Sequence, residues 1–222
     1  MNTRGNGKGS IQLSWLGHSM FLLEGSDGVK IVTDPYSGKT GYSVPKVTAD
    51  IVTISHHHYD HDNIGAVGGS PKTVESPGNF EFGSTIIEGI QSYHDEVMGE
   101  KRGKNVIFKI FLNQLIIAHM GDYGQPKMMD EQLDALRGVD ILLIPVGGTY
   151  TIDAEQAAEV VQRVEPKIVV PMHYKTRDCV IKVASVEPFL QRVSIVKRKE
   201  GSVQVSASEI PGKTEVWVME YI

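Results

Sequence analysis

Four of the eight histidines in this chain lie within six residues, in the segment SHHHYDH at 55–61. His56 and His58 are two positions apart, so on an extended segment both imidazoles point to the same side and can bind one metal ion. Asp60 and His61 follow directly and add a carboxylate and a third imidazole. An open catalytic zinc ion usually takes three protein ligands, so four from one short segment are too many for a single ion. The spacing therefore predicts two ions that share a site.

Two simpler interpretations of this segment compete with a metal site. A histidine-rich tract is also typical of a solvated surface loop or of an adventitious metal binder. However, the apolar run DIVTI at 50–54 directly precedes the histidines and is typical of a short buried strand. The pattern H-x-H-x-D-H at the end of such a strand is much more specific than a lone histidine, which is usually structural or exposed. We therefore predict a metal site here.

The elements that must position these residues are strands at first and alternating helices and strands afterwards. Apolar runs predict strands at 11–15, 20–23, 29–33, 50–54, 84–90, 105–111, 114–119, 139–145 and 167–171, with three more near the C-terminus. Helices are predicted at 129–138, 153–164 and 183–191, the second opened by Asp153 with Gln156 three residues on. No linker or low-complexity tract interrupts this order, so 10–222 is expected to form one α/β domain.

Composition and charge exclude several classes of protein. Of the 222 residues, 41% are hydrophobic and 22% are charged, as in an ordinary globular domain. The formal charge of −5 lacks the basic excess of a nucleic-acid binder, and no apolar run has the length of a transmembrane helix. Cys179 is the single cysteine, which excludes an internal disulfide and favours a cytoplasmic location. Residues 1–9 are expected to be a flexible, polar arm and not a signal peptide.

The motif H-x-H-x-D-H resembles the signature of the metallo-β-lactamase superfamily. Further segments are similar to one branch of it: WLGHSMFLLEG (15–25), IVTDP (31–35), AHMGD (118–122), LIPVGGTYTID (143–153) and VVPMHY (169–174). That branch contains small cytosolic metal-dependent hydrolases similar to ascorbate-6-phosphate lactonase. The resemblance spans about 11–175. It implies an αββα sandwich, in which two mixed β-sheets are flanked by helices and the metals lie at one edge.

The resemblance also implies which side chains bind which ion. Each ion is expected to have three ligands of its own and one shared carboxylate. The first ion would be bound by His56, His58 and His94, the second by Asp60, His61 and His173, and both by Asp122. His94 matches the family only as a histidine after an aromatic residue, so a surface histidine is the alternative at that position.

Other branches of the superfamily fit the chain less well. Antibiotic-hydrolysing members with a cysteine ligand need a thiolate between the third and the last histidine, but Cys179 comes after His173. The di-iron oxidoreductases usually carry Glu where this chain has His58, and they have an attached flavodoxin domain for which there is no room. Cys179 is therefore expected to be a small buried thiol without a catalytic role.

The expected donors also indicate the chemistry. Imidazole and carboxylate ligands without sulfur suit zinc, and they tolerate manganese or iron. Two such ions would hold a shared water and lower its pKa toward about 7, so that a bridging hydroxide attacks a carbonyl carbon or a phosphorus. Asp122 and Asp60 at the ions, and His119 close to them, are the candidate catalytic residues.

Four further residues are candidates for contacts around the ions or with the substrate. Asp34, at a strand end, could accept the second N–H of a metal-bound imidazole. His18, in a tight turn between strands, could reach the substrate. Lys175 and Arg177 follow His173 and could clamp an anionic group. For His18, His119 and Asp34 a purely structural role remains equally open, and for the two cations the alternative is a solvated loop.

The leading hypothesis is a dinuclear metal-dependent hydrolase that acts on a small cytosolic ester, foremost a lactone. A phosphodiesterase or nuclease that uses the same ions is the second hypothesis. The third is a metal-binding protein without turnover. The expected partner is a small-molecule substrate, with neither nucleic acid nor membrane, and the sequence sets no oligomeric state.

Overall fold

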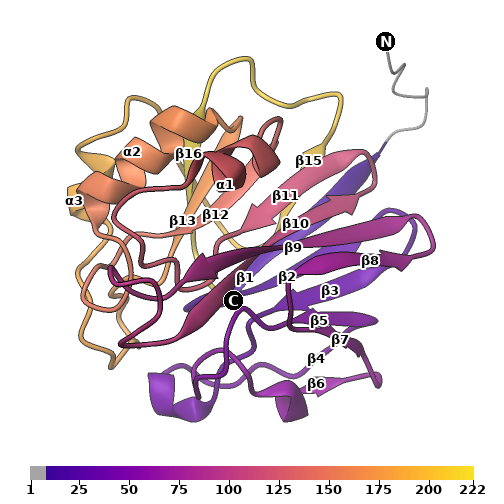
Figure 1. Ribbon diagram of the computed structural model, residues 1–222. Coiled ribbons are helices and arrows are strands. Elements are labelled where there is room, and N and C mark those ends of the chain that lie inside the picture. Colours follow the sequence, from indigo (N-terminus) through magenta and orange to yellow (C-terminus); the bar gives the residue numbers. More distant parts are fainter. Residues whose placement is uncertain (1–8) are drawn as a thin grey trace.

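The computed structural model describes residues 9–222, which form two β-sheets packed face to face (Figure 1). The six-stranded sheet has the order β15 (Val203–Ser206), β1 (Ser10–Gly17), β2 (Met20–Gly25), β3 (Lys30–Thr33), β5 (Ile51–Thr53) and β7 (Lys72–Val74). The eight-stranded sheet has the order β14 (Val196–Lys199), β16 (Glu215–Met219), β13 (Ile168–Met172), β12 (Ile141–Pro145), β11 (Leu115–His119), β10 (Lys104–Leu112), β9 (Thr85–Tyr93) and β8 (Gly78–Phe82). Both sheets are mixed, as predicted.

The strand directions bring several strand ends together. In the six-stranded sheet β3, β5 and β7 are parallel, and in the eight-stranded sheet β11, β12 and β13 are parallel. β9 runs in the direction of β11 because β10 is antiparallel to both. The residues that follow β5, β9, β11 and β13 come together with the turn between β1 and β2. The candidate ligands thus lie where the ends of the two sheets meet.

The space between the sheets is filled by alternate residues of each strand. Leu13 and Trp15 of β1 and Phe21 and Leu23 of β2 are buried in the same core cluster as Phe108 of β10. Side chains two apart on a strand point to the same face, so this alternation directs one face of each strand inward. Burial of each such side chain contributes roughly 1.5–3 kcal/mol, which holds the two sheets together.

The outer face of the six-stranded sheet is covered by loops. Val32 of β3 and Val52 of β5 point away from the main core and form a second buried cluster with Tyr36, Tyr42 and Ile181. These three residues come from the loops that follow β3 and β13. The expected helix layer is absent from this face within the part of the chain that the structure describes, where it is replaced by the loops and by the 3₁₀ helix η1 (Gly38–Thr40).

The α-helices lie together beside the eight-stranded sheet (Figure 1). They are α1 (Asp130–Ala135), α2 (Ala154–Val164) and α3 (Glu187–Leu190). The Asp153 carboxylate accepts hydrogen bonds from the backbone N–H groups of Glu155 and Gln156, so the predicted capping box is confirmed. The helix predicted at 183–191 is wrong in extent, because only one turn of it forms. The α/β class and the two mixed sheets are confirmed.

Short elements complete the described chain. β4 (Val47–Thr48) pairs with β6 (Val67–Gly68), and the 3₁₀ helix η2 (Ile64–Ala66) precedes β6. Of the predicted arm, residues 1–8 lie outside the described residues. Gly9 is buried, and its carbonyl oxygen accepts a hydrogen bond from the N–H of Ala207, directly before β1 begins at Ser10. None of the helices described in residues 9–222 has the length and apolar character needed to cross a membrane.

Candidate metal centre

The segment after β5 makes a tight turn through its histidines. The carbonyl oxygen of His58 accepts hydrogen bonds from the N–H groups of His61 and Asp62, at 2.8 and 3.2 Å. This turn divides the motif between two groups of neighbouring ligand atoms: His56 and His58 belong to one, and Asp60 and His61 to the other. A single short loop therefore supplies ligands to two places.

The first group consists of His56, His58 and His94. One ring nitrogen from each lies within 4.8 Å of the others, so one ion could contact all three. The rings of His56 and His94 are 4.6 Å apart, and those of His58 and His94 are 5.2 Å apart. His94 follows β9 and is 2% exposed, so it is not the surface histidine that the sequence left open as an alternative.

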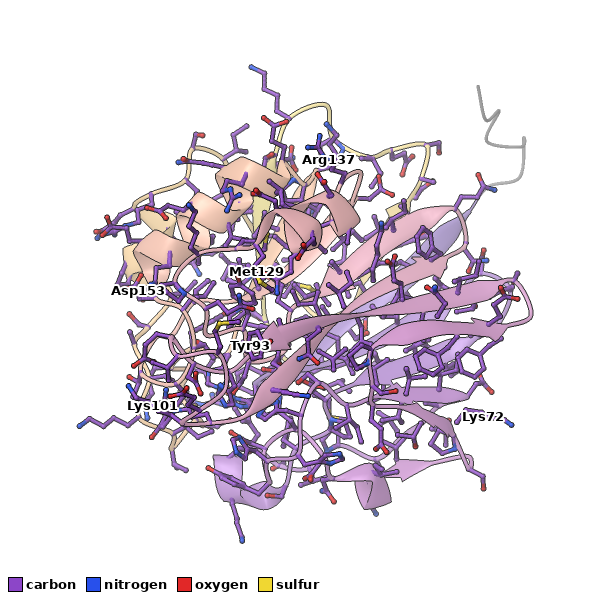
Figure 2. All side chains as sticks on the ribbon, viewed as in Figure 1. Lys72, Tyr93, Lys101, Met129, Arg137 and Asp153 are labelled. Carbon is purple, nitrogen blue, oxygen red and sulfur yellow. The ribbon has the colours of Figure 1, made fainter. Side chains whose placement is uncertain are left out.

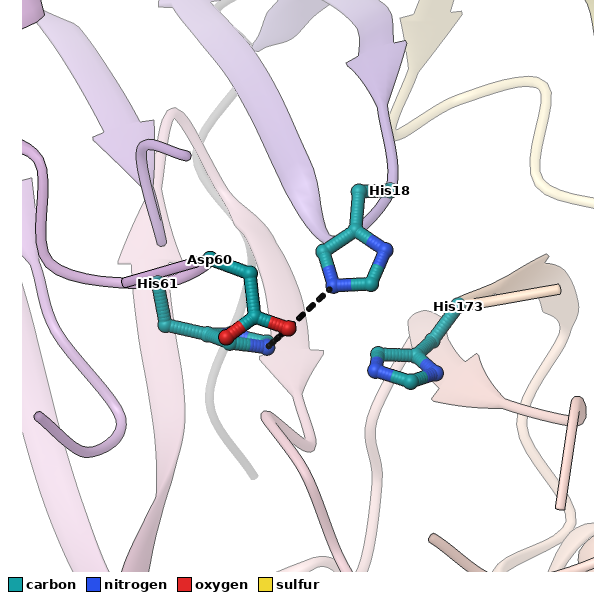
Figure 3. Close-up of side chains that lie close together, drawn as sticks. All are labelled: His18, Asp60, His61 and His173. Atoms are coloured by element: carbon teal, nitrogen blue, oxygen red, sulfur yellow. Dashed lines mark ion pairs between the residues drawn. The ribbon is translucent and has the colours of Figure 1, made fainter. Parts of the chain in front are cut away.

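The second group contains Asp60, His61 and His173, and it also includes His18 (Figure 3). The Nε2 atom of His18 lies 3.3 Å from Oδ2 of Asp60, and the rings of His18 and His173 are 4.2 Å apart. The sequence predicted three of these residues as ligands and left His18 open between a substrate contact and a structural role. The structure brings His18 among the ligands instead.

The Asp122 carboxylate lies between the two groups. Its Oδ2 is 3.3 Å from Nε2 of His94 and 3.4 Å from Nε2 of His173, and its Oδ1 is 3.2 Å from Nε2 of His61. Nε2 of His56 is 3.8 Å from Oδ2. One carboxylate thus faces histidines of both groups, which is the geometry expected of a shared ligand.

The turn that carries Asp122 depends on close packing. Asn105 Oδ1 accepts a hydrogen bond from the Asp122 N–H at 2.9 Å, and Asn105 Nδ2 donates to Met120 O at 2.9 Å. A Cβ on Gly121 would lie 2.4 Å from both Asn105 Oδ1 and Ser55 Cβ, and one on Gly124 would lie 2.5 Å from the His94 carbonyl carbon. Sequence reasoning missed Asn105, whose partner is 17 residues away. The two glycines of GDYG were its only local signal.

Asp34 ties the histidine loop to the end of β3. Its Oδ1 accepts the N–H of Ser55 at 2.8 Å, and its Oδ2 accepts the Ser55 hydroxyl at 2.6 Å and contacts His61 Nδ1 at 2.8 Å. When Nδ1 of His61 donates its proton to Asp34, Nε2 keeps its lone pair toward Asp122 and the ion. The carboxylate is completely buried, so it orients the imidazole without touching substrate.

Burial and charge set the protonation of the ligands. Burial and the neighbouring His61 lower the pKa of His56 well below its usual value, so its imidazole is neutral. Burial alone would raise the pKa of Asp122, but His173 and His61 outweigh it and hold that pKa well below the ordinary range. Burial lowers the pKa of His61, while Asp122 and Asp34 outweigh it and raise that pKa well above normal. Metal binding is therefore expected to release a proton from His61.

His119 is buried close to the centre, but its ring faces away from the ligand groups. Nε2 lies 2.8 Å from the carbonyl oxygen of Ser19, and Nδ1 accepts the N–H of Gly121 at 3.2 Å. Both ring nitrogens are thus used by the backbone, and His119 belongs to none of the ligand groups among the described residues. This is the position of a residue that supports the Asp122 turn, so the geometry does not favour the predicted catalytic role.

Lys175 and Arg177 do not face the candidate ions. The Lys175 ammonium donates to the carbonyl oxygen of Cys179, and the Arg177 guanidinium pairs with Asp178 at 3.0 Å. Both line a cavity of about 550 Å³ beside Tyr174 whose lining contains none of the candidate ligands. The predicted anion clamp therefore has no contact with the metal centre.

A different pair of cations lies next to the first ligand group. A cavity of about 380 Å³ is lined by His56, His58, Arg102 and Lys104, among others. Arg102 is held by a hydrogen bond to the Thr149 carbonyl oxygen at 3.3 Å and by the ring of Tyr150, 5.7 Å away. Nothing in the segment KRGK at 101–104 indicates this position, because the segment comes near the histidines only in the folded chain.

The loop that carries Arg102 is built around Asp95, directly after His94. The Asp95 carboxylate accepts four backbone N–H groups, those of Val97, Gly99, Lys101 and Arg102. These bonds outweigh the effect of burial and lower the pKa of Asp95 to about 2. Figure 2 labels Tyr93, the last residue of β9 before this loop, and Lys101 within the loop. The same carboxylate thus fixes both the exit of His94 from β9 and the position of Arg102.

Several buried nitrogen and oxygen atoms of the candidate ligands have no hydrogen-bond partner among the described residues, as expected of atoms that bind metal ions. Buried atoms with no hydrogen-bond partner among the described residues include His56 Nε2, His61 Nε2, Asp122 Oδ1 and Nδ1 of His94 and His173. A buried polar atom without a partner is unfavourable by about 1–3 kcal/mol, and several in one place require a common acceptor of their lone pairs. Imidazole and carboxylate donors in groups of three and four suit a divalent ion such as zinc, manganese or iron.

Comparison with known proteins places this site in a family. A family model described as the beta-lactamase superfamily domain matches residues 12–173. A metal-dependent hydrolase of Pelotomaculum thermopropionicum is 32% identical over 75% of this chain and 85% of its own length. The chain therefore belongs to the metallo-β-lactamase superfamily, as the histidine motif predicted.

Solved structures agree with this family. A Thermotoga maritima protein assigned to the zinc-dependent hydrolases of the superfamily has a TM-score of 0.79 and 33% identity, and the match covers 96% of this chain and 100% of that one. A metallo hydrolase of Ignicoccus hospitalis has a TM-score of 0.63 at 23% identity and covers 89% and 98% of the two chains, which supports the fold alone.

Replacement of Asp122 tests the shared ligand. Asp122→Ala should reduce bound metal from two ions per chain to one, because both ions lose a carboxylate that neutralises them. Metal analysis after reconstitution with zinc or manganese measures this. Asp62→Ala, on the same loop but in none of the ligand groups, is the control and should keep both ions. An Asp122→Ala protein that retains two ions would show that another residue bridges them.

Variants of His119 and His173 distinguish a residue that supports the ligands from a residue that binds an ion. His173→Ala should lose the second ion. His119→Ala should keep both, with metal affinity or turnover reduced by about 10–100-fold, because its ring holds the Asp122 turn and belongs to none of the ligand groups. Metal content and binding affinity are measured for both variants side by side. Loss of an ion from His119→Ala together with two ions in His173→Ala would mean that the last ligand is assigned to the wrong histidine.

Proposed function

We propose that this chain is a metal-dependent hydrolase that binds two divalent ions, preferably zinc, and cleaves a small ester, foremost a lactone. The observation that carries the proposal is the position of the Asp122 carboxylate, 3.2–3.8 Å from histidines of both ligand groups. The name of the relative from Pelotomaculum thermopropionicum supports the reaction class. The cytoplasm is the proposed compartment, since the single cysteine, Cys179, allows no internal disulfide.

The bound ions would supply an activated water and a Lewis acid for the oxygen that becomes negative during hydrolysis. The side chains of the protein would orient the ligands and accept the proton. Asp122 aligns the two ligand groups, and Asp34 sets the tautomer of His61. Asp60 is the candidate proton acceptor, because its carboxylate is the most exposed of the ligand carboxylates at 13%. Burial raises the pKa of Asp60, but the contacts with His18 and His61 outweigh it and keep the carboxyl ionised.

No serine or cysteine nucleophile is needed for this reaction. Cys179 lies in the cluster on the outer face of the six-stranded sheet, with Val52 and Tyr42, and is 2% exposed. Ser55 is close to the ligands, but its hydroxyl donates to Asp34. Its part is therefore to hold the loop. These placements favour attack by water rather than a covalent intermediate.

A phosphodiester is the second candidate substrate, because the same ions can activate water toward phosphorus. The cavity beside His56 and His58 contains Arg102 and Lys104, and these cations suit a substrate that carries a negative charge. We therefore propose an anionic small molecule, either a lactone with a charged substituent or a small phosphodiester. The two candidates differ in the atom that water attacks, which is the carbonyl carbon in the lactone and the phosphorus in the phosphodiester.

A substrate panel separates these activities. The two-ion protein should hydrolyse a series of aliphatic lactones faster than bis-nitrophenyl phosphate, with Asp122→Ala as the background. Turnover by kcat/KM is measured for each substrate. Higher values for the phosphodiester would favour the second candidate. A protein that holds two ions and hydrolyses no member of a broad ester panel would be a metal-binding protein without turnover.

Removal of Arg102 tests the charge of the substrate. Arg102→Ala should raise KM about tenfold or more for a lactone with a carboxylate or phosphate substituent, since a charge-assisted hydrogen bond contributes roughly 1.5–3 kcal/mol. The KM for the neutral lactone and both kcat values should change little. Lys175→Ala, in the other cavity, is the matched control. Equal effects of Arg102→Ala on charged and neutral lactones would contradict an anion contact.

A further inference from the structure

We propose that His18 is a ligand of the second metal ion, together with Asp60, His61 and His173. This inference rests on the proposed two-ion site. The four residues each offer one ligand atom, and these atoms lie within 4.8 Å of one another, so a single ion can reach all of them. His18 comes from the turn between β1 and β2, whereas the other three come from the histidine loop and from the end of β13. Figure 3 shows the four side chains converging.

The His18 ring is buried, and its two ring nitrogens have the environment expected of a metal ligand. It is 0% exposed, and neither Nδ1 nor Nε2 has a hydrogen-bond partner among the described residues. Nε2 lies 3.3 Å from Oδ2 of Asp60, and the ring is 4.2 Å from that of His173 and 5.1 Å from that of His61. Buried imidazoles normally have a hydrogen-bond partner, so a completely buried ring without one requires another explanation. A metal ion at Nε2 would account for that nitrogen, whose one close contact among the described residues is the ion pair with Asp60.

The backbone of His18 is held in a conformation that few side chains adopt. Its φ of 51° lies in the left-handed region, after Gly17 at 101°. Its carbonyl oxygen accepts hydrogen bonds from the Trp15 indole N–H at 3.0 Å and from the N–H of His173 at 3.2 Å. Backbone strain of this kind persists where neighbouring contacts over-determine it, and it is common at ligand sites. The turn thus fixes both the ring of His18 and its distance from the next ligand.

A fourth ligand makes the two ions unequal. The first group has three histidines, of which His58 is exposed, whereas the second has His18, Asp60, His61 and His173, all buried. With Asp122 shared, the second ion would have five protein ligands and the first ion four. The first ion therefore keeps more open positions and exchanges faster, and the second is held more firmly. A chelator should remove the first ion before the second.

Cobalt titration of the metal-free protein tests this assignment. His18→Asn is the first variant, because Asn tolerates a positive φ, and His18→Gly is the second, because Gly adopts it without strain. His119→Asn is the matched control, another histidine that is 0% exposed. The wild-type protein should bind two Co²⁺. In both His18 variants, the Co²⁺ at the second ligand group should bind more than about 100-fold more weakly than in the wild-type protein. This is beyond the 10–100-fold effect typical of residues behind the ligands.

Two further readouts distinguish a ligand from a supporting residue. Loss of a nitrogen donor should change the visible absorption of the second Co²⁺, and it should reduce the rise in Tm on metal binding without lowering the Tm of the metal-free protein. An unchanged spectrum with weaker binding would mean that His18 acts through Asp60, which overturns the ligand assignment. Unchanged affinity and spectrum would also overturn it.

The proposed function can fail separately. A wild-type protein that binds fewer than two Co²⁺ would contradict the two-ion site itself. Two bound Co²⁺ without any ester hydrolysis would contradict the enzyme, while the comparison of His18→Asn with His119→Asn would still decide whether His18 binds the ion.

Discussion

The structure depends on one buried carboxylate. Asp122 is 2% exposed, and an isolated ionised carboxylate in such a place is strongly unfavourable unless it is paired or binds metal. Nε2 atoms of four histidines lie 3.2–3.8 Å from it. In the metal-free protein His61 can carry the balancing positive charge, and ions replace that charge when they bind. The surrounding imidazoles therefore compensate this carboxylate, and it lies where a ligand shared by both groups would be needed.

The turn around Asp122 can occupy this position only because small residues surround it. Gly121 packs against Ser55 of the histidine loop, and Gly124 packs against the backbone of His94. Each glycine thus brings a second ligand-bearing segment into contact with the turn, and Asn105 connects the turn to β10. The three segments of the site thus contact one another directly. The ions do not have to hold flexible loops in place.

The local parts of this site could be predicted from the sequence, and the long-range parts could not. The run from His56 to His61 after an apolar strand identifies a metal site by spacing alone. The position of His18 depends on a contact with His173 across 155 residues, and no pattern within either segment indicates it. Arg102 and Lys175 show the same limit. Both follow a candidate ligand in sequence, but Arg102, whose N–H bonds to Asp95, lines the cavity beside His56 and His58, whereas Lys175 bonds to the Cys179 carbonyl oxygen.

The fold itself was predictable to the extent that apolar and polar residues alternate along the strands. Leu13, Trp15, Phe21 and Leu23 point inward with the period of two that the sequence shows. The loops that cover the outer face of the six-stranded sheet were not predictable, because Tyr36, Tyr42 and Ile181 have no regular spacing and are recognisable as core residues only once Val32 and Val52 need a cover.

The distribution of ligands between the two sheets links metal binding to folding. His18 and the histidine loop follow strands of the six-stranded sheet, whereas His94, Asp122 and His173 follow strands of the eight-stranded sheet. Each ligand group therefore takes side chains from both sheets, so an ion bound there would join the two sheets. Ligands arranged in this way do not exist in the unfolded chain, so the free energy of metal binding adds to the free energy of unfolding. The backbone bond from His173 N–H to His18 O makes the same connection without metal, which keeps the two halves of the site in register before any ion arrives.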